Sequence, residues 1–129
     1  MISIKTQIIS KTQNSKRYDL EERTFIFAKN VRLFVKTLPK TTANLEDGKQ
    51  LVRSSGSMGA NYIEANESLS KKDFVMRVKI CRKEAKESAY WIKLIIETKT
   101  FINKNEAEIL LNEAIELKKI FSAIVQKSV

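Results

Sequence analysis

The sequence predicts an all-α protein, an antiparallel up-down-up-down bundle of four helices. The 129 residues include only three glycines and one proline, so few residues interrupt helical segments. Apolar residues recur at spacings of three and four along four long segments, which is the periodicity of one helix face. Short polar stretches separate these segments, and short connections favour antiparallel neighbours. The length suits one domain with a single core.

The first 17 residues differ in composition from the rest of the chain. They are rich in Ser, Thr, Gln and Lys and contain no acidic residue, a composition typical of a mobile segment. We therefore expect residues 1–17 to form a basic mobile N-terminal tail and residues 18–129 to form the bundle domain.

The first helix is predicted to begin at Asp19 and to end before Pro39. Asp19 and Glu22 have the spacing of an N-cap residue and its N3 partner. Proline disfavours the helical conformation of the residue before it, so Pro39 marks the end. The expected core stripe is Leu20, Thr24, Phe27, Val31, Phe34 and Leu38.

The second helix is predicted to begin between Thr42 and Leu45 and to run to about Leu69. Its apolar and small residues again alternate spacings of four and three. The expected core stripe is Leu51, Ser55, Met58, Tyr62, Ala65 and Leu69.

The third and fourth helices each begin at a capping pair, Ser70 with Asp73 and Asn103 with Glu106. The third helix is expected to end near Thr100. Its core stripe should be Phe74, Val78, Cys81, Ala85, Ser88, Ile92 and Ile95. The stripe of the fourth should be Leu110, Ala114, Leu117, Phe121 and Ile124.

Several kinds of reactive site are missing from the sequence. The chain has no histidine, which excludes histidine-based triads, histidine general bases and the Glu-x-x-His pairs of di-iron bundles. The single cysteine, Cys81, excludes a disulfide framework and is expected in the core. There is no glycine-rich phosphate loop. We expect no catalytic residue, no metal site and no cofactor, and therefore not an enzyme.

Four glutamates repeat at a spacing of three on the second and third helices. Such residues favour a role as surface partners of nearby lysines, although a carboxylate cluster is the alternative. The residues are Glu64, Glu67, Glu84 and Glu87.

The chain carries 24 basic and 15 acidic residues, which gives a net charge of +9. Such a charge favours a polyanionic partner, most often nucleic acid, with an anionic membrane surface or plain lysine-rich helices as alternatives. No apolar run approaches the roughly 18 residues that a membrane span needs, and no signal-type apolar block opens the chain. We expect a cytoplasmic protein with no membrane partner.

A basic stripe on the third helix is the candidate nucleic-acid site. At about 100° per residue its members fall in a sector of roughly 100°. Lysines neutralise phosphates and an interleaved ring stacks on bases, although a solvated helix face has the same appearance. The candidate residues are Lys72, Lys79, Arg82, Lys83, Lys86, Tyr90 and Lys93.

A second apolar patch on the third helix lies away from the core stripe and predicts a further buried contact, preferentially with another subunit. The patch consists of Met76, Ile80, Trp91 and Leu94. On the second helix, Gly56 and Gly59 each cost about 1 kcal/mol relative to alanine, which close approach of another helix would offset. A small-residue face there also fits a subunit interface, or else a tight crossing within the chain. That face consists of Arg53, Ser57, Ala60 and Glu64.

Several motifs in order resemble one known family. They are YDLEERTFIFAKNVRLFV at residues 18–35, LP at 38–39, QLVRSSGSMGANYIEA at 50–65 and KEAKESAYWIKL at 83–94. They are similar to the bacterial four helix bundle protein family, whose founding members are encoded in intervening sequences of 23S ribosomal RNA genes. The resemblance implies homopentameric rings of antiparallel four-helix bundles. It also implies a shape like that of the accessory proteins of diversity-generating retroelements, which bind nucleic acid and a reverse transcriptase.

The family's recurring positions fall on both central helices. Its polar positions match Arg53, Ser54, Ser57, Glu64 and Glu84, and its aromatic positions match Tyr62, Tyr90 and Trp91. Met58 and Ser88 stand where the family commonly has Ile and Thr, which are mild changes within the core. The resemblance carries no catalytic residue.

Two functions follow from the sequence. The first is a non-enzymatic, oligomeric protein that binds RNA or another nucleic acid through its basic surface. The alternative is an adaptor that positions a nucleic-acid enzyme such as a reverse transcriptase. Steep loss of nucleic-acid affinity with salt would support the first, and salt-insensitive capture of a protein partner would support the second.

Overall fold

The part of the chain that the structure describes forms four helices, as the sequence predicts. The computed structural model describes residues 16–98 and 103–129, and within these ranges there is no strand. The predicted N-terminal tail lies outside the described residues except for its last two positions. The helices are α2 (Lys16–Lys36), α3 (Thr42–Asn66), α4 (Lys71–Thr98) and α5 (Lys104–Ser128).

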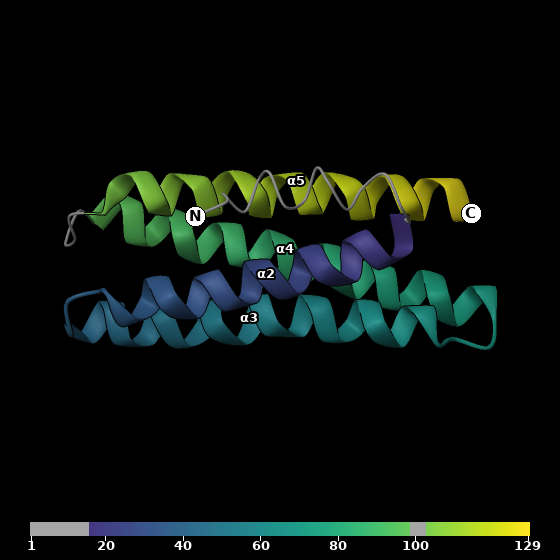
Figure 1. Ribbon diagram of the computed structural model, residues 1–129, viewed down its shortest axis with the longest axis horizontal. Helices are drawn as coiled ribbons and strands as arrows, with labels where there is room; N and C mark the ends of the chain where they lie inside the picture. The colour runs from purple at the N-terminus through teal and green to yellow at the C-terminus, as the bar shows by residue number, and fades with distance from the viewer. Residues whose placement is uncertain (1–15, 99–102) are drawn as a thin grey trace.

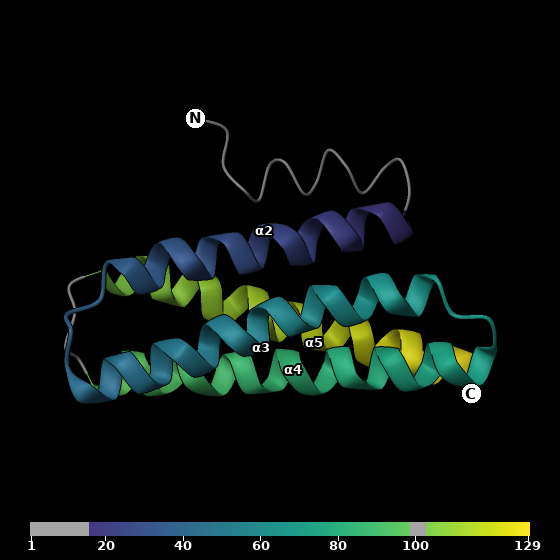
Figure 2. The ribbon, with the colours of Figure 1, turned by 90° about the horizontal axis from the view of Figure 1, so that it is seen from below.

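The four helices lie side by side as long rods of similar length (Figure 1). The turn between α2 and α3 lies at one end of the molecule, and the turn between α3 and α4 lies at the opposite end (Figures 1 and 2). Helix α4 packs extensively against both α3 and α5, whereas α2 contacts α3 more than α5. The α3–α4 pair is therefore the central unit on which the other two helices rest.

The starts of the helices follow local side-chain chemistry. At α3, the Thr41 side chain accepts a hydrogen bond from the Asn44 backbone N–H at 3.1 Å. At α4, the Ser70 hydroxyl accepts one from the Asp73 N–H at 3.1 Å, so the predicted cap is confirmed. Helix α2 begins at Lys16, three residues before the predicted start, and Asp19 is therefore a helical residue and not the N-cap.

Two helix ends differ from the prediction. Helix α3 stops at Asn66, so Leu69 lies in the turn before α4 and is fully exposed, and its predicted place in the core is wrong. Asn103 is the N-cap of α5, but its amide donates to the Glu106 carboxylate at 2.6 Å and caps no backbone amide. The predicted end of α4 near Thr100 lies outside the described residues.

The core contains nearly every residue predicted from helical periodicity. Two predicted positions, Phe74 and Ile124, are only partly buried, and their neighbours Val75 and Val125 are buried instead. The largest fully buried side chains are Phe27, Phe34, Phe121, Leu51, Met58, Ile92, Ile95 and Leu117.

Small hydroxyl side chains of the core are hydrogen-bonded within it. The Thr24 hydroxyl donates to the Leu20 carbonyl at 2.9 Å, and the hydroxyls of Ser54 and Ser88 lie 2.8 Å apart between α3 and α4. Small hydroxyl side chains therefore let the central helices approach closely without leaving an unsatisfied donor.

Cys81 is a core residue, as predicted. Its thiol is fully buried and donates to the Met58 carbonyl at an S···O distance of 3.4 Å. Burial raises the pKa of the Cys81 thiol to about 12. The thiol therefore stays protonated at neutral pH, which is typical of a structural cysteine.

The three glycines of the chain lie in α3 and all approach side chains of α2. A Cβ added to Gly59 would lie 3.1 Å from Thr24 Oγ1, and one added to Gly48 would lie 3.0 Å from Val35 Cγ1. The close approach inferred from the helical glycines is thus a crossing within the chain.

No helix in the described ranges is long and apolar enough to cross a membrane.

Candidate nucleic-acid and subunit interfaces

The predicted basic stripe lies along α4. Five of its six cationic side chains are exposed and Arg82 is half-buried. Within residues 20–98 and 103–129, no ion pair joins any of them to a carboxylate. Tyr90, the ring of the stripe, is 57% exposed. The cations of this face are therefore exposed or half-buried and are not held in ion pairs by carboxylates of the described residues.

Arg53 links α3 to two carboxylates of α4. Its guanidinium binds Glu84 at 3.3 Å through Nη1 and Glu87 at 2.8 Å through Nη2. The Glu84 side chain is only 6% exposed. The prediction of a surface partner of lysines is therefore wrong for Glu84, which is buried, whereas Glu87 stays partly exposed. Both bind one arginine, because the α3–α4 contact places Arg53 over them.

The ion pairs of this cluster shift its acid–base equilibria. The hydrogen bond with Glu87 is the main cause that raises the pKa of Arg53 above its usual range. Hydrogen bonds with Glu84 and then with Arg53 lower the pKa of Glu87. Among the described residues, Glu84 Oε1 is buried without a hydrogen-bond partner. Arg53 is thus the cation that the described residues place against this buried carboxyl group.

The apolar patch of α4 lies beside this cluster. Met76 is 50% exposed, and the other three patch residues are half-buried. Residues 80, 84, 87, 91 and 94 alternate spacings of four and three, so glutamates and apolar residues form one helix face. Since Arg53 reaches into this face from α3, the two predicted interface regions are neighbours on the surface.

The small-residue face of α3 is open. Arg53, Ala60 and Glu64 are exposed, and Ser57 is half-buried with its hydroxyl accepting from the Asn61 amide at 3.1 Å. The glycines lie toward α2 and not on this face. Burial of this face by another subunit therefore stays a prediction, and the glycines no longer support it.

Tyr90 and Trp91 connect the basic stripe with the apolar patch. Their ring centroids lie 5.0 Å apart with an edge-to-face angle of 77°. The indole N–H of Trp91 is buried and has no acceptor among the described residues. The two rings therefore lie where the basic stripe and the apolar patch meet.

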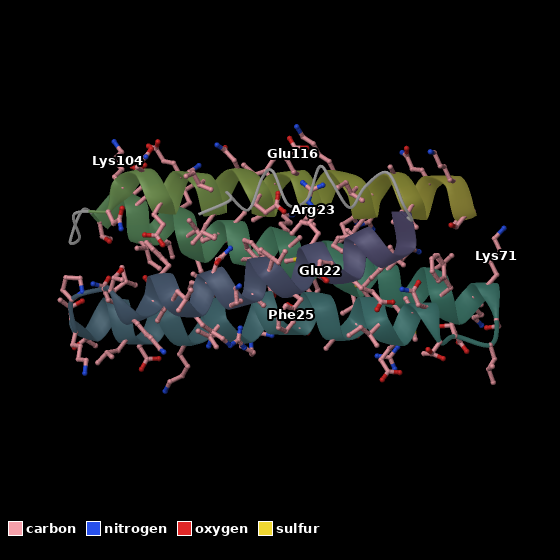
Figure 3. The ribbon with its side chains drawn as sticks, viewed as in Figure 1. Glu22, Arg23, Phe25, Lys71, Lys104 and Glu116 are labelled. Carbon is pink, nitrogen blue, oxygen red and sulfur yellow. The ribbon has the colours of Figure 1, made fainter. Side chains whose placement is uncertain are left out.

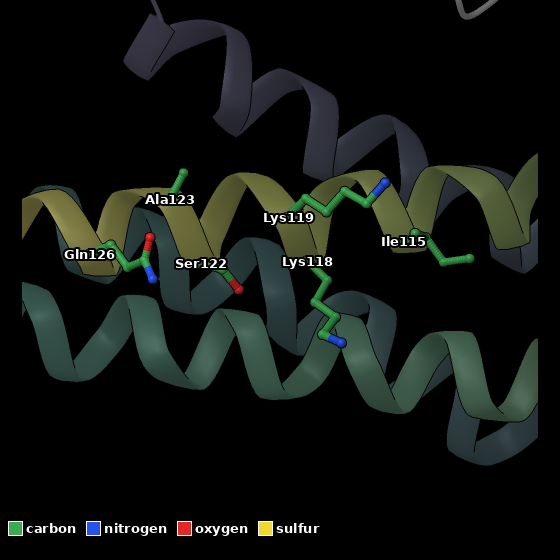
Figure 4. Close-up of a pocket in the computed structure, with 6 residues that line it drawn as sticks. All are labelled: Ile115, Lys118, Lys119, Ser122, Ala123 and Gln126. Atoms are coloured by element: carbon green, nitrogen blue, oxygen red, sulfur yellow. The ribbon is translucent and has the colours of Figure 1, made fainter.

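Two other surface features were not predicted from the sequence. On α2, Phe25 is 67% exposed near the start of residues 23–45, a stretch that contains no acidic residue. This basic composition is visible in the sequence and could have indicated a second basic surface. On α5, a hollow of ≈ 380 Å³ is lined by six residues of that one helix, including Lys118 and Lys119 (Figure 4). These two lysines point to different sides of the helix and do not converge on one ligand.

Comparison with known proteins reveals one family. Residues 16–123 match the model of the family described as 23S rRNA-intervening sequence protein. The chain is also similar to a crystal structure of a protein of unknown function from the S23 ribosomal protein family of Bacteroides thetaiotaomicron VPI-5482, with 31% identity and a TM-score of 0.74. That match covers 82% of this chain and 97% of the other. No curated protein matches the chain.

Proposed function

This chain belongs to the 23S rRNA-intervening sequence protein family, and we propose that it is a non-enzymatic RNA-binding protein that works as a homo-oligomer. The observation that carries this proposal is the basic stripe of α4. Its cations are exposed or half-buried, and no carboxylate of the described residues is paired with them. Accessible cations along one helix face suit the regularly spaced phosphates of a nucleic acid.

Oligomerisation would strengthen this binding. Each phosphate contact releases counterions and adds only a little affinity, whereas several copies that engage one RNA add their contacts through high effective concentration. The apolar patch of α4 and the neighbouring small-residue face of α3 supply the surface for subunit contact.

We further propose an antiparallel bundle, a ring of five copies and a cytoplasmic location. The α2–α3 turn and the α3–α4 turn lie at opposite ends of the molecule, which supports the antiparallel order (Figures 1 and 2). The number five follows from the family resemblance. Absence of histidine and engagement of Glu84 and Glu87 by Arg53 support a role without catalysis.

Charge reversal on α4 tests the proposal. Lys79, Lys83 and Lys86 are exposed, so changing all three to Glu should preserve the core. Each change moves the charge from +1 to −1, which is 3 × 2 = 6 units per subunit. Affinity for RNA in a gel-shift titration at two salt concentrations should fall sharply, and the slope of log affinity against log salt should flatten.

A matched control carries the same charge change on another helix. Lys118, Lys119 and Lys127 are exposed on α5, and their change to Glu should reduce RNA affinity much less. Light scattering shows whether both variants keep the size of the wild type. Equal binding by the α4 variant and the wild type would contradict the proposed role of the stripe and favour the protein adaptor.

A further inference from the structure

The outer face of α2 is a second basic surface that the proposed function does not use. From Arg23 to Leu45 the chain has five cationic residues and no acidic residue. One of the five, Arg23, forms a two-point ion pair with Glu113 of α5, with both N···O distances at 2.8 Å. Figure 3 shows Arg23 pointing toward α5 and Phe25 on the opposite side of α2.

Four residues make up the surface that we call the α2 outer face: Phe25, Lys29, Arg32 and Lys36. All four side chains are exposed. At about 100° per residue they fall in a sector of about 60° and extend over about 16 Å of helix. An exposed ring is thus followed on the same face by three cations. The acidic residues of α2 all precede Arg23 in the sequence.

Arg32 is held in place by α3. Its Nη1 donates to the Ala28 carbonyl at 3.0 Å, and its Nη2 lies 3.5 Å from the Val52 carbonyl. A Cβ added to Gly56 would lie 3.0 Å from Nη2. The guanidinium therefore lies against the bare backbone of α3. A guanidinium has five N–H donors, so these contacts leave donors for an anion on its exposed side.

Gly56 differs from Gly59 in what it accommodates. Gly59 meets Thr24, which is buried and bonded, whereas the closest neighbours of Gly56 are the end atoms of an exposed side chain. Helix packing alone does not require a glycine at position 56, although glycine is unfavourable in the middle of a helix. The missing Cβ leaves room for the Arg32 guanidinium against α3.

We propose that the α2 outer face binds single-stranded RNA, with Lys29, Arg32 and Lys36 on phosphates and Phe25 stacked on a base. The inference rests on the proposed RNA-binding function and adds a second contact surface to it. A ring next to a row of cations is the combination that single strands engage, because their bases are free to stack. A protein partner would have to place acidic groups over three cations and is the weaker match.

Neutralisation tests the phosphate contacts. The full-length variant Lys29→Ala/Arg32→Ala/Lys36→Ala is titrated with an oligouridine of about 20 nucleotides, long enough to cover several contacts. Loss of three contacts should lower the slope of log affinity against log salt by about 2 and weaken binding on the order of a hundredfold near 0.1 M salt. The control Lys118→Ala/Lys119→Ala/Lys127→Ala should keep more of the affinity.

Two single variants test the ring and the seated arginine. Phe25→Ala should weaken binding about fivefold or more without changing the salt slope, because stacking releases no counterions, and Phe25→Trp should restore it. Gly56→Ala keeps every charge but displaces the guanidinium, so it should weaken binding in a protein whose circular dichroism is that of the wild type.

The outcomes separate this inference from the proposed function. If the wild type binds the RNA and the α2 variants bind it as well as the control does, the inference is overturned and the α4 stripe alone carries binding. If the wild type binds no RNA, both are overturned. If only the α2 variants lose affinity, with unchanged size by light scattering, the α2 outer face is the main RNA surface.

Discussion

At the scale of single residues, the two glycines in the middle of α3 have different neighbours. The Cβ position of Gly59 lies 3.1 Å from Oγ1 and 3.4 Å from Cβ of Thr24, a buried side chain bonded to the Leu20 carbonyl. The Cβ position of Gly56 instead meets the terminal atoms of the exposed Arg32 side chain. A methyl group at 59 would push α2 away from α3, whereas one at 56 displaces only a guanidinium.

The same substitution at these two positions should therefore change stability in opposite directions. Gly56→Ala should raise the free energy of unfolding by up to about 1 kcal/mol through helix propensity. Gly59→Ala should lower it by about 1–3 kcal/mol, because overpacking exceeds the propensity gain. Urea denaturation of both variants measures the difference. Equal shifts of the two midpoints would contradict this account of the α2–α3 crossing.

At the scale of helices, α2 is held to its two neighbours by different interactions. Apolar packing and close backbone approach join it to α3, whereas its contact with α5 is smaller and contains the Arg23–Glu113 ion pair. Both partners of that pair are mostly buried and meet through two parallel hydrogen bonds. Such two-point pairs are stronger than exposed ion pairs, because two parallel charge-assisted hydrogen bonds form in a fixed geometry with less screening by solvent.

Loss of this ion pair should loosen α2 against α5. Glu113→Gln should lower the free energy of unfolding by about 1–2 kcal/mol, since it removes two charge-assisted hydrogen bonds. Glu116→Gln, on the same helix, is the control: Glu116 meets Lys119 at 3.9 Å on the surface, and its loss should cost less than about 0.5 kcal/mol. Hydrogen exchange should be faster in α2 of the first variant only. Equal effects of the two substitutions would show that the buried pair contributes no more than the surface pair.

At the scale of the whole molecule, the packing of α3 against α4 forms a surface that contains both apolar and charged side chains. The face of α4 that contains Glu84 and Glu87 also contains Ile80, Trp91 and Leu94, and Arg53 of α3 reaches across to it. A surface with apolar side chains around an internally paired charge cluster is suited to burial against a second copy. We therefore expect the assembled protein to use it.

Charge placed on this surface should reduce the size of the assembly. Trp91→Glu should give a smaller species by light scattering, because a carboxylate would be buried against the neighbour. Met76→Glu should do the same, and because Met76 is half-exposed this change leaves the core of one subunit intact. Tyr90→Glu, on the basic stripe, should keep the wild-type size. A monomeric wild type at micromolar concentration would contradict the expected interface.

Much of the architecture could be predicted from helical periodicity, because that information is local. Burial repeats every three or four residues within one helix, so stripes such as Val78, Cys81 and Ala85 are visible without knowledge of any partner. Capping is equally local, as Ser70 and Asp73 show. Leu69 was assigned wrongly because it continues the periodicity of α3 after the helix has ended at Asn66.

Some features of the candidate surfaces depend on spacing within one helix, and others depend on contacts between residues far apart in the sequence. Spacing within single helices was enough to predict four helices, most of their buried faces and the exposed lysine stripe of α4. The burial of Glu84 against Arg53 and the contact of Arg32 with the backbone at Gly56 depend instead on how the helices pack. These pairs are 31 and 24 residues apart in sequence, and they meet because packing rotates particular faces of α2, α3 and α4 toward one another.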